Sequence, residues 1–160
     1  MMRIDDIDIS ILANLQKNGR MTNVKLAKDA RISAPPCLRR LKAMERNGII
    51  AGYHAEINAD AFGFGFRAIC IITLTSQNPV DVEEFVNCVT KLKNIRYCFA
   101  TPGNSDFILG IIAKNLEDYE DIIQKKIQND GNIKSIKTLI LMKKHKDEYG
   151  IPVEVTEASN

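Results

Sequence analysis

The chain has 160 residues, of which 45% are hydrophobic and 26% are charged, a composition typical of folded proteins and unlike that of disordered ones. The length suits one ordinary domain or two small ones, and no apolar run approaches the roughly 20 residues that a membrane-spanning helix needs. A formal net charge of only +2 excludes a uniformly basic protein. The N-terminal MMRIDDIDIS is acidic where a signal peptide is basic, so we expect a cytoplasmic protein with no membrane partner.

The positive charge is concentrated in one short segment. Residues 1–60 hold ten Lys and Arg side chains against seven Asp and Glu, whereas residues 61–160 hold twelve against thirteen. Residues 31–46 alone contain five basic side chains and one acidic side chain. A local excess of this kind indicates a binding surface for an anionic partner.

The cysteines do not predict a metal site. The four cysteines fall in no close pair and lie far from both histidines in the sequence. A zinc site needs clustered ligands, so neither a metal nor a cofactor is expected. In a cytoplasmic protein the thiols are expected to be reduced and structural.

The first third of the chain predicts three helices. Asp5 suits the N-cap of the first, with Asp8 three residues later, and Thr22 suits the N-cap of a short second helix. Ser33 opens a third helix that ends just before Gly48, since glycine adopts the left-handed conformation at a helix C-terminus without steric cost. A short helix, a tight turn and a basic helix in this order are typical of a helix-turn-helix.

The rest of the chain predicts an α+β domain. A strand is expected over residues 49–58, followed by a hinge at Gly63 and Gly65. From there the pattern predicts strands and helices in the order β-α-β-β-α-β, at 67–75, 79–94, 95–101, 106–114, 116–130 and 133–142. This order is the ferredoxin-like split βαβ motif. The predicted domains are a helix-turn-helix domain at 1–52, a connecting strand and hinge at 53–65, a ferredoxin-like domain at 66–150 and a tail at 151–160.

The third helix is predicted to have an apolar and a basic face. We take Leu41 as the centre of the buried face. Three residues fall within about 60° of it at 100° per residue: Cys37, Leu38 and Met44. Arg39 lies about 160° away. An ordinary solvated surface would have a similar pattern, but the position after a short capped helix favours DNA binding.

Two adjacent prolines stand at the start of this helix. Counted from Ser33 as the N-cap, Pro35 and Pro36 occupy positions whose backbone N–H groups have no intrahelical partner, so no helical hydrogen bond is lost. An N-cap serine normally accepts from these N–H groups, and the Ser33 hydroxyl is therefore free to bind a phosphate or a base. The tip formed by Ser33, Ala34 and Pro35 is expected to enter a DNA groove closely and to contact it through side chains.

The basic side chains suggest a division of roles on double-stranded DNA. Arg39 is the best candidate for reading a base edge, because bidentate contact of arginine with guanine is the commonest specific contact in the major groove. Arg40, Lys42 and Arg46 are expected to contact phosphates. A single helix-turn-helix reads few bases, so a dimer on two half-sites is expected.

Three stretches resemble a known family: RIDDIDISILANLQKNGRMTNVKLA, ISAPPCLRRLKAMERNGIIAGY and IRYCFATPGNSDFIL. The chain is similar over essentially its whole length to the Lrp/AsnC family, the feast/famine regulators of bacteria and archaea. The resemblance implies a winged-type helix-turn-helix, a connecting strand and a ferredoxin-like effector and oligomerisation domain. It also implies homodimers that pair through the C-terminal sheets and often assemble into octamers.

The resemblance further implies a small effector, usually an amino acid, near the loop between the second and third strands of the C-terminal domain. The matching residues here are Pro102, Gly103, Asn104, Ser105 and Asp106. A glycine lets a backbone approach a ligand, and a carboxylate can pair with an α-ammonium group. A tight hairpin turn would also favour Gly and Asn, so a purely structural role for this loop stays open.

The sequence departs from the family pattern at two positions. Arg31 stands in the turn where the family usually has glycine, which costs roughly 1 kcal/mol if the position is left-handed and adds a positive charge near the DNA backbone. Pro102 stands where many members have a small polar residue and removes one backbone donor from the effector loop.

Three functions are compatible with the sequence. The first is a sequence-specific, nucleoid-associated transcriptional regulator that responds to an amino acid or similar metabolite. The second is an architectural protein that wraps DNA without an effector. The third, less favoured, is an enzyme similar in fold to haem-pathway decarboxylases. Such catalysis would need a tetrapyrrole pocket with basic or histidine side chains in the second half of the chain, where the one histidine is His145, near the C-terminal end.

Overall fold

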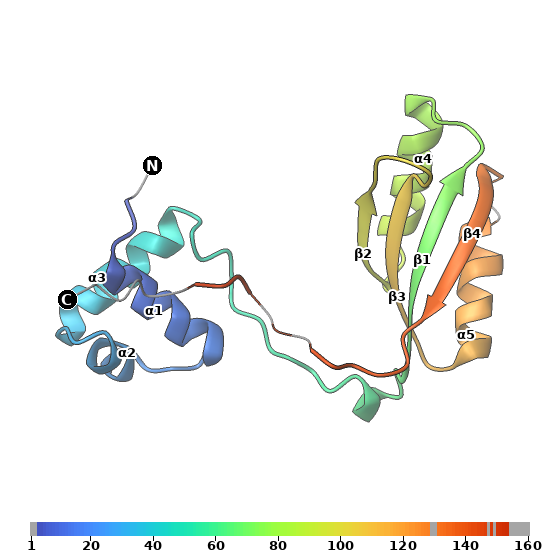
Figure 1. Cartoon of the computed structure of the whole chain (residues 1–160). Helices are drawn as coiled ribbons and strands as arrows, with labels where there is room; N and C mark the ends of the chain where they lie inside the picture. The colour runs from blue at the N-terminus through green and yellow to red at the C-terminus, as the bar shows by residue number, and fades with distance from the viewer. Residues whose placement is uncertain (1–2, 129–130, 147, 149, 154–160) are drawn as a thin grey trace. The chain divides into compact units, whose positions relative to one another are not determined.

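The computed structural model describes residues 3–128, 131–146, 148 and 150–153, and the chain divides into two compact units (Figure 1). One unit combines the described residues up to Glu56 with those from Lys146 onward, and the other comprises Ile57–His145. Of the predicted tail at 151–160, residues 154–160 lie outside the described residues. No helix in the described part of the chain is long and apolar enough to cross a membrane.

The three predicted helices form the first unit: α1 (Asp6–Lys17), α2 (Asn23–Asp29) and α3 (Ala34–Arg46). The predicted N-caps are confirmed. Asp5 accepts from the Asp8 backbone N–H at 3.0 Å, the Asp8 carboxylate accepts from the Asp5 N–H at 3.2 Å, and Thr22 accepts from the Lys25 N–H at 3.3 Å. The helices bury a shared apolar core made of Ile11, Leu26, Ala27, Ala30, Cys37 and Met44.

The end of the described chain is held by α1. The side-chain amide of Gln16 donates to the Ile151 carbonyl oxygen at 3.1 Å and accepts from the Ile151 N–H at 2.8 Å. Gly150 lies so close that a Cβ there would overlap the Gln16 side chain. The chain therefore leaves this unit after α3 and later returns to it.

The segment between α3 and the sheet has little regular structure. Residues 49–58, predicted as a strand, form no strand in the structure, where all ten are described. A strand is stabilised by hydrogen bonds to a neighbouring strand. The alternating pattern of residues 49–58 predicts which side chains would share a face, but it does not show whether a neighbouring strand is present. A short 3₁₀ helix, η1 (Asp60–Phe62), follows and ends at Gly63, whose φ is 77°.

The second unit is a four-stranded antiparallel sheet with helices on one face (Figure 1). Its strands are β1 (Phe66–Leu74), β2 (Ile95–Ala100), β3 (Phe107–Ala113) and β4 (Ile133–Ile140), in the spatial order β2-β3-β1-β4. Between them run α4 (Pro79–Thr90) and α5 (Leu116–Asp121), the latter continued by the π-helix η2 (Ile122–Ile127). The order β1-α4-β2-β3-α5-β4 confirms the predicted α+β, ferredoxin-like fold. The predicted end of the second helix, 129–130, lies outside the described residues.

The two faces of this sheet differ. Alternate residues of β1 and β3 are buried against the helices, where the Phe85 and Phe107 rings lie 4.9 Å apart between centroids. The other face, which α4 and α5 leave uncovered, carries large apolar side chains. We call it the open face and define it by Ile69, Ile71, Tyr97, Phe99, Ile108 and Leu139.

None of the four cysteines, all of which lie in the described part of the chain, forms a disulfide, which agrees with the prediction of reduced thiols. Burial raises the pKa of the Cys37 and Cys70 thiols, which keeps them protonated and unreactive. Cys70 Sγ also lies 3.0 Å from the Tyr119 hydroxyl inside the core of the second unit.

Candidate functional site

The turn between α2 and α3 closes α2 with a Schellman motif. The Ile32 N–H donates to the Ala27 carbonyl at 2.9 Å, and the Arg31 N–H donates to the Lys28 carbonyl at 3.1 Å. Arg31 has a φ of 56°, which makes it the one non-glycine residue with positive φ in the described part of the chain. The left-handed position that would normally be glycine is therefore occupied by a strained, exposed arginine.

The tip of α3 has the predicted shortage of donors. Ser33 is the N-cap but its side chain makes no capping hydrogen bond, since the two prolines have no N–H to offer it. The first helical bond is made by the Cys37 N–H, which donates to the Ser33 carbonyl at 3.3 Å. Ser33 and Pro35 are exposed, whereas Ala34 is half-buried and its carbonyl accepts from the Asn23 side chain of α2 at 2.8 Å.

The buried face of α3 is rotated from its predicted position. Cys37 and Met44 are fully buried, Leu41 is half-buried, and Leu38 is 40% exposed. The prediction that Leu38 faces the core is therefore wrong. The centre of the buried face lies between Cys37 and Met44, about 50° from Leu41 toward Arg40 at 100° per residue. This rotation exposes Leu38 and brings Arg40 to the edge of the core.

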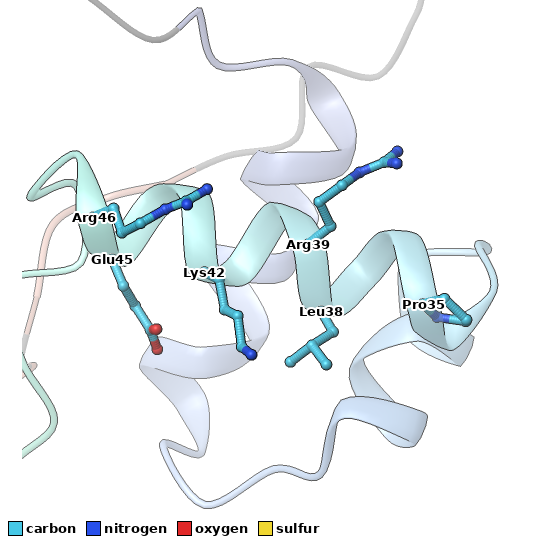
Figure 2. Close-up of a pocket in the computed structure, with 6 residues that line it drawn as sticks. All are labelled: Pro35, Leu38, Arg39, Lys42, Glu45 and Arg46. Atoms are coloured by element: carbon cyan, nitrogen blue, oxygen red, sulfur yellow. The ribbon is translucent and has the colours of Figure 1, made fainter.

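The exposed side of α3 is an open, shallow depression, which we call the recognition face (Figure 2). It is lined by Pro35, Leu38, Arg39, Lys42, Glu45 and Arg46. Leu38, Lys42 and Glu45 extend along one edge of the helix, and Arg39 and Arg46 extend along the other. Within the described residues, Arg39, Lys42 and Arg46 make no ion pair. Three free cations on one helix face can contact phosphates and base edges.

Arg40 is not part of this face. Its Nη1 donates to Asp5 Oδ2 at 2.8 Å and to Asp8 Oδ1 at 2.9 Å, and both contacts are ion pairs between α3 and the start of α1. The hydrogen bonds that Arg40 donates to Asp8 and Asp5 raise the pKa of its guanidinium. Arg40, which the sequence predicted to contact a phosphate, is thus hydrogen-bonded to two carboxylates of the protein itself.

Glu45 has a partner beyond the helix. The Tyr53 hydroxyl donates to Glu45 Oε1 at 2.9 Å. Partial burial, followed by this hydrogen bond to a carboxylate, raises the pKa of Tyr53 to about 12. The bond fixes an acidic side chain at the edge of the recognition face.

The sequence missed Leu38 and Glu45 as members of the recognition face. An exposed leucine can contact the methyl group of thymine, and a carboxylate can accept from the amino group of cytosine. Cys37 and Met44 are both uncharged and lie seven positions apart, which places them on the same side of a helix. Centring the buried face on this pair would have predicted the correct rotation of α3.

The loop between β2 and β3 is closed by its own hydrogen bonds. The Asp106 carboxylate accepts from the Leu74 N–H at 2.7 Å and from the Gln77 side chain at 2.8 Å. The Thr101 N–H donates to the Asp106 carbonyl at 2.9 Å, and the Thr101 hydroxyl donates to the Ser105 carbonyl at 3.0 Å. Asp106 therefore ties this loop to the end of β1.

The tip of the same loop is exposed. Pro102, Gly103 and Asn104 are exposed and Ser105 is half-buried. Gly103 has a φ of 109°, a conformation that other residues adopt only under strain. The predicted effector residues thus lie together on one tight turn, with the carboxylate of Asp106 at its base.

Comparison with known proteins agrees with both halves of this structure. Residues 4–51 match the family described as winged helix-turn-helix DNA-binding. Residues 67–151 match the Lrp/AsnC ligand binding domain. The chain belongs to the Lrp/AsnC family. This Lrp/AsnC chain is a DNA-binding transcriptional regulator with an N-terminal helix-turn-helix.

Relatives match this Lrp/AsnC regulator along nearly its whole length. It is 36% identical to the leucine-responsive regulatory protein of Rhizobium meliloti, over 95% of this chain and 97% of that protein. It is 32% identical to the Escherichia coli K12 protein of the same name, over 94% and 92%. Among solved structures, a transcriptional regulator of Neisseria meningitidis in complex with L-methionine is similar with a TM-score of 0.90 and 28% identity, over 94% of this chain and 97% of that one.

No metal site accompanies these features in the described residues. Among residues 3–128, 131–146, 148 and 150–153, no three His, Cys, Asp or Glu side chains are grouped so that they could hold a metal ion.

Proposed function

We propose that this protein regulates transcription by binding specific double-stranded DNA and that an amino acid controls this binding. The observation that carries the effector half is the L-methionine bound to the Neisseria relative, whose chain aligns with 94% of this one at a TM-score of 0.90. DNA as the partner supports action at the nucleoid in the cytoplasm.

The β2–β3 loop is the proposed effector site, formed by Pro102, Gly103, Asn104, Ser105 and Asp106. The exposed Asn104 side chain and the backbone at Gly103 are free to meet a small polar ligand. The carboxylate of Asp106 already accepts two hydrogen bonds, but each of its oxygens retains a second lone pair for an ammonium group. An amino acid would therefore bind to a loop that is already ordered.

Titration with each of the free amino acids, followed by calorimetry and by DNA binding, tests this site. Asn104→Ala should weaken binding of the active amino acid, whereas the exposed α4 variant Asn87→Ala should leave it unchanged. Equal behaviour of the two variants would place the effector elsewhere. If no amino acid changed DNA binding or assembly, the effector half of the proposal would fail and an architectural role would remain.

We assign separate roles to the DNA-contacting side chains. In this assignment Arg39 reads a base edge, and Lys42 and Arg46 contact phosphates. All three project from the recognition face, and none forms an ion pair with another described residue. Ser33 and Arg31 contact the backbone beside the tip, and Ala34 and Pro35 allow that tip to approach closely.

A salt series with duplexes selected from a random pool separates these roles. Arg39→Ala should relax specificity at one base position by about 1–3 kcal/mol, and Lys42→Ala should weaken binding to all sequences and reduce the salt slope by about 1. Ser33→Ala should weaken binding if the free hydroxyl contacts DNA. Uniform binding to all duplexes would instead indicate a DNA-wrapping protein.

We propose that the open face joins two copies into a homodimer. On this face Tyr97, Phe99 and Leu139 are 39%, 61% and 42% exposed, and apolar side chains gathered on one uncovered face mark protein interfaces. Phe99→Glu should shift the mass measured by light scattering toward the monomer, while Val80→Glu, on an exposed position of α4, should not. The same measurement distinguishes a dimer from an octamer.

We also propose that the protein acts by binding and not by catalysis. Support comes from the family match, since the matched relatives are named as regulators. A visible absorbance band in the purified protein would revive the tetrapyrrole-enzyme alternative.

A further inference from the structure

The start of α1 and the middle of α3 share one hydrogen-bond network. Asp5 and Asp8 cap α1 reciprocally, each carboxylate accepting the other residue's backbone N–H through one oxygen. The remaining oxygen of each carboxylate accepts from Arg40 Nη1. All four carboxylate oxygens are therefore engaged, and a single guanidinium nitrogen bridges both acids.

The burial of Asp8 makes this network necessary for the fold. Asp8 is 1% exposed and is the one buried charged residue among those described. A buried carboxylate needs a cation and hydrogen bonds to remain ionised, and Arg40 supplies the only ion pair that the described residues offer it. Moving Arg40 onto a DNA phosphate would leave the Asp8 charge buried without a counter-ion.

The same contact fixes the direction of the recognition face. Cys37 and Met44 form a narrow, fully buried strip on α3, and Ala34 and Leu41 pack against the same core on the side of this strip toward Leu38. Arg40 lies about 50° from the centre of that strip, on the side away from Leu38. Its bonds to α1 hold the flank of α3 that Ala34 and Leu41 do not, so the helix is fixed on both sides of the strip and Arg39, about 100° further round, points outward (Figure 2).

We infer that Arg40 is a positioning residue for DNA binding: held by Asp5 and Asp8, it sets the rotation of α3 and does not itself touch DNA. The positive charge nearest to the middle of the recognition helix thus serves the protein's own structure. Among the basic side chains of α3, the contacts to DNA are left to Arg39, Lys42 and Arg46.

A matched pair of variants tests this role. Arg40→Gln and Lys42→Gln each remove one positive charge from α3, two residues apart. Binding of each variant to a mixed-sequence duplex and to a duplex selected by the parent protein is measured over a range of salt concentrations. Loss of one phosphate contact lowers the salt slope by about 0.9.

Lys42→Gln should lower the slope by this amount. Arg40→Gln should leave the slope unchanged and should weaken binding to the selected duplex by roughly tenfold or more, the discrimination that one misplaced base contact carries. The slope does not depend on the fraction of active protein, so partial unfolding of the variant does not obscure the result. A slope lowered equally in both variants would overturn the inference.

Substitution of Asp5, one of the two carboxylates that bind Arg40, gives a second test, because the two possible roles of Arg40 predict different changes in DNA affinity. If Arg40 contacted phosphate, Asp5→Asn would release it from a competing charge and strengthen DNA binding. If Arg40 positions α3, Asp5→Asn should give equal or weaker binding to the selected duplex. Asn is as good an N-cap as Asp and Asp5 is half-exposed, so this variant keeps its fold. Tighter binding by Asp5→Asn would refute the positioning role.

Discussion

Arg31 and Gly48 occupy the same place in two copies of one motif. At the end of α3 the Ile49 N–H donates to the Met44 carbonyl at 2.9 Å and the Gly48 N–H donates to the Glu45 carbonyl at 3.0 Å, as their counterparts do at the end of α2. The φ angles are 56° for Arg31 and 69° for Gly48. We therefore predict that Arg31→Gly stabilises the protein.

The size of the effect follows from two opposing contributions. A left-handed non-glycine residue is strained by roughly 1–2 kcal/mol, and glycine loses about 0.5–1 kcal/mol through the greater freedom of the unfolded chain. The net gain for Arg31→Gly is about 0.5–1 kcal/mol. With a urea m-value of about 1–3 kcal/mol/M, the unfolding midpoint should rise by a few tenths molar.

Arg31→Ala is the matched control, because it removes the same charge and keeps the strain. Its midpoint should stay near that of the parent, and Gly48→Ala should lower the free energy of unfolding by about 1 kcal/mol. Arg31→Gly and Arg31→Ala should weaken DNA binding equally if the charge at this position contacts the DNA backbone. Equal free energies of unfolding for Arg31→Gly and Arg31→Ala would show that the backbone at Arg31 is not strained.

Three further outcomes are expected. Absorbance titration of the tyrosines should show one phenol with a pKa of about 12, and this titration should disappear in Tyr53→Phe. Because the pKa of Tyr53 is raised in the folded protein, the stability from its hydrogen bond to Glu45 is present below about pH 10 and is lost as the pH rises through about 12. Gly110→Ala should lower the free energy of unfolding by about 1–3 kcal/mol, since its Cβ would overlap the Tyr97 ring, and the loss measured by urea unfolding should shrink in a Tyr97→Ala background. Asp106→Ala should destabilise the protein by about 1–3 kcal/mol without any effector, because the end of β1 loses its acceptor, and an unchanged unfolding curve would contradict this structural role.

Local sequence signals predicted the elements well. The caps at Asp5 and Thr22 depend on contacts within three residues, and the strand and helix periods of the second half depend on burial of one face. The order βαββαβ followed directly from them. The prolines were also interpreted correctly, since the missing donors are a property of the residues themselves.

Long-range contacts could not be predicted in the same way. The ion pairs of Arg40 join positions 35 and 32 residues apart, and a charge on a helix does not reveal whether its partner is DNA or a carboxylate of the same chain. The phase of α3 likewise depends on where α1 and α2 lie, which is why Leu38 was placed on the wrong face. Residues 49–58 have the alternating pattern of a strand, but they pair with no neighbouring strand among the described residues.

In the proposed mode of DNA binding, the proline-containing tip of α3 would lower the entropy cost of association. The rings of Pro35 and Pro36 fix two φ angles in the unfolded chain as well as in the folded one. Little conformational freedom therefore remains at the tip to be lost when it meets DNA, and that loss is one of the main terms opposing association. Differences in affinity between DNA sites should consequently arise from Arg39 and its neighbours, and from how easily the DNA itself deforms, because a tip fixed in this way would present the same shape to every site.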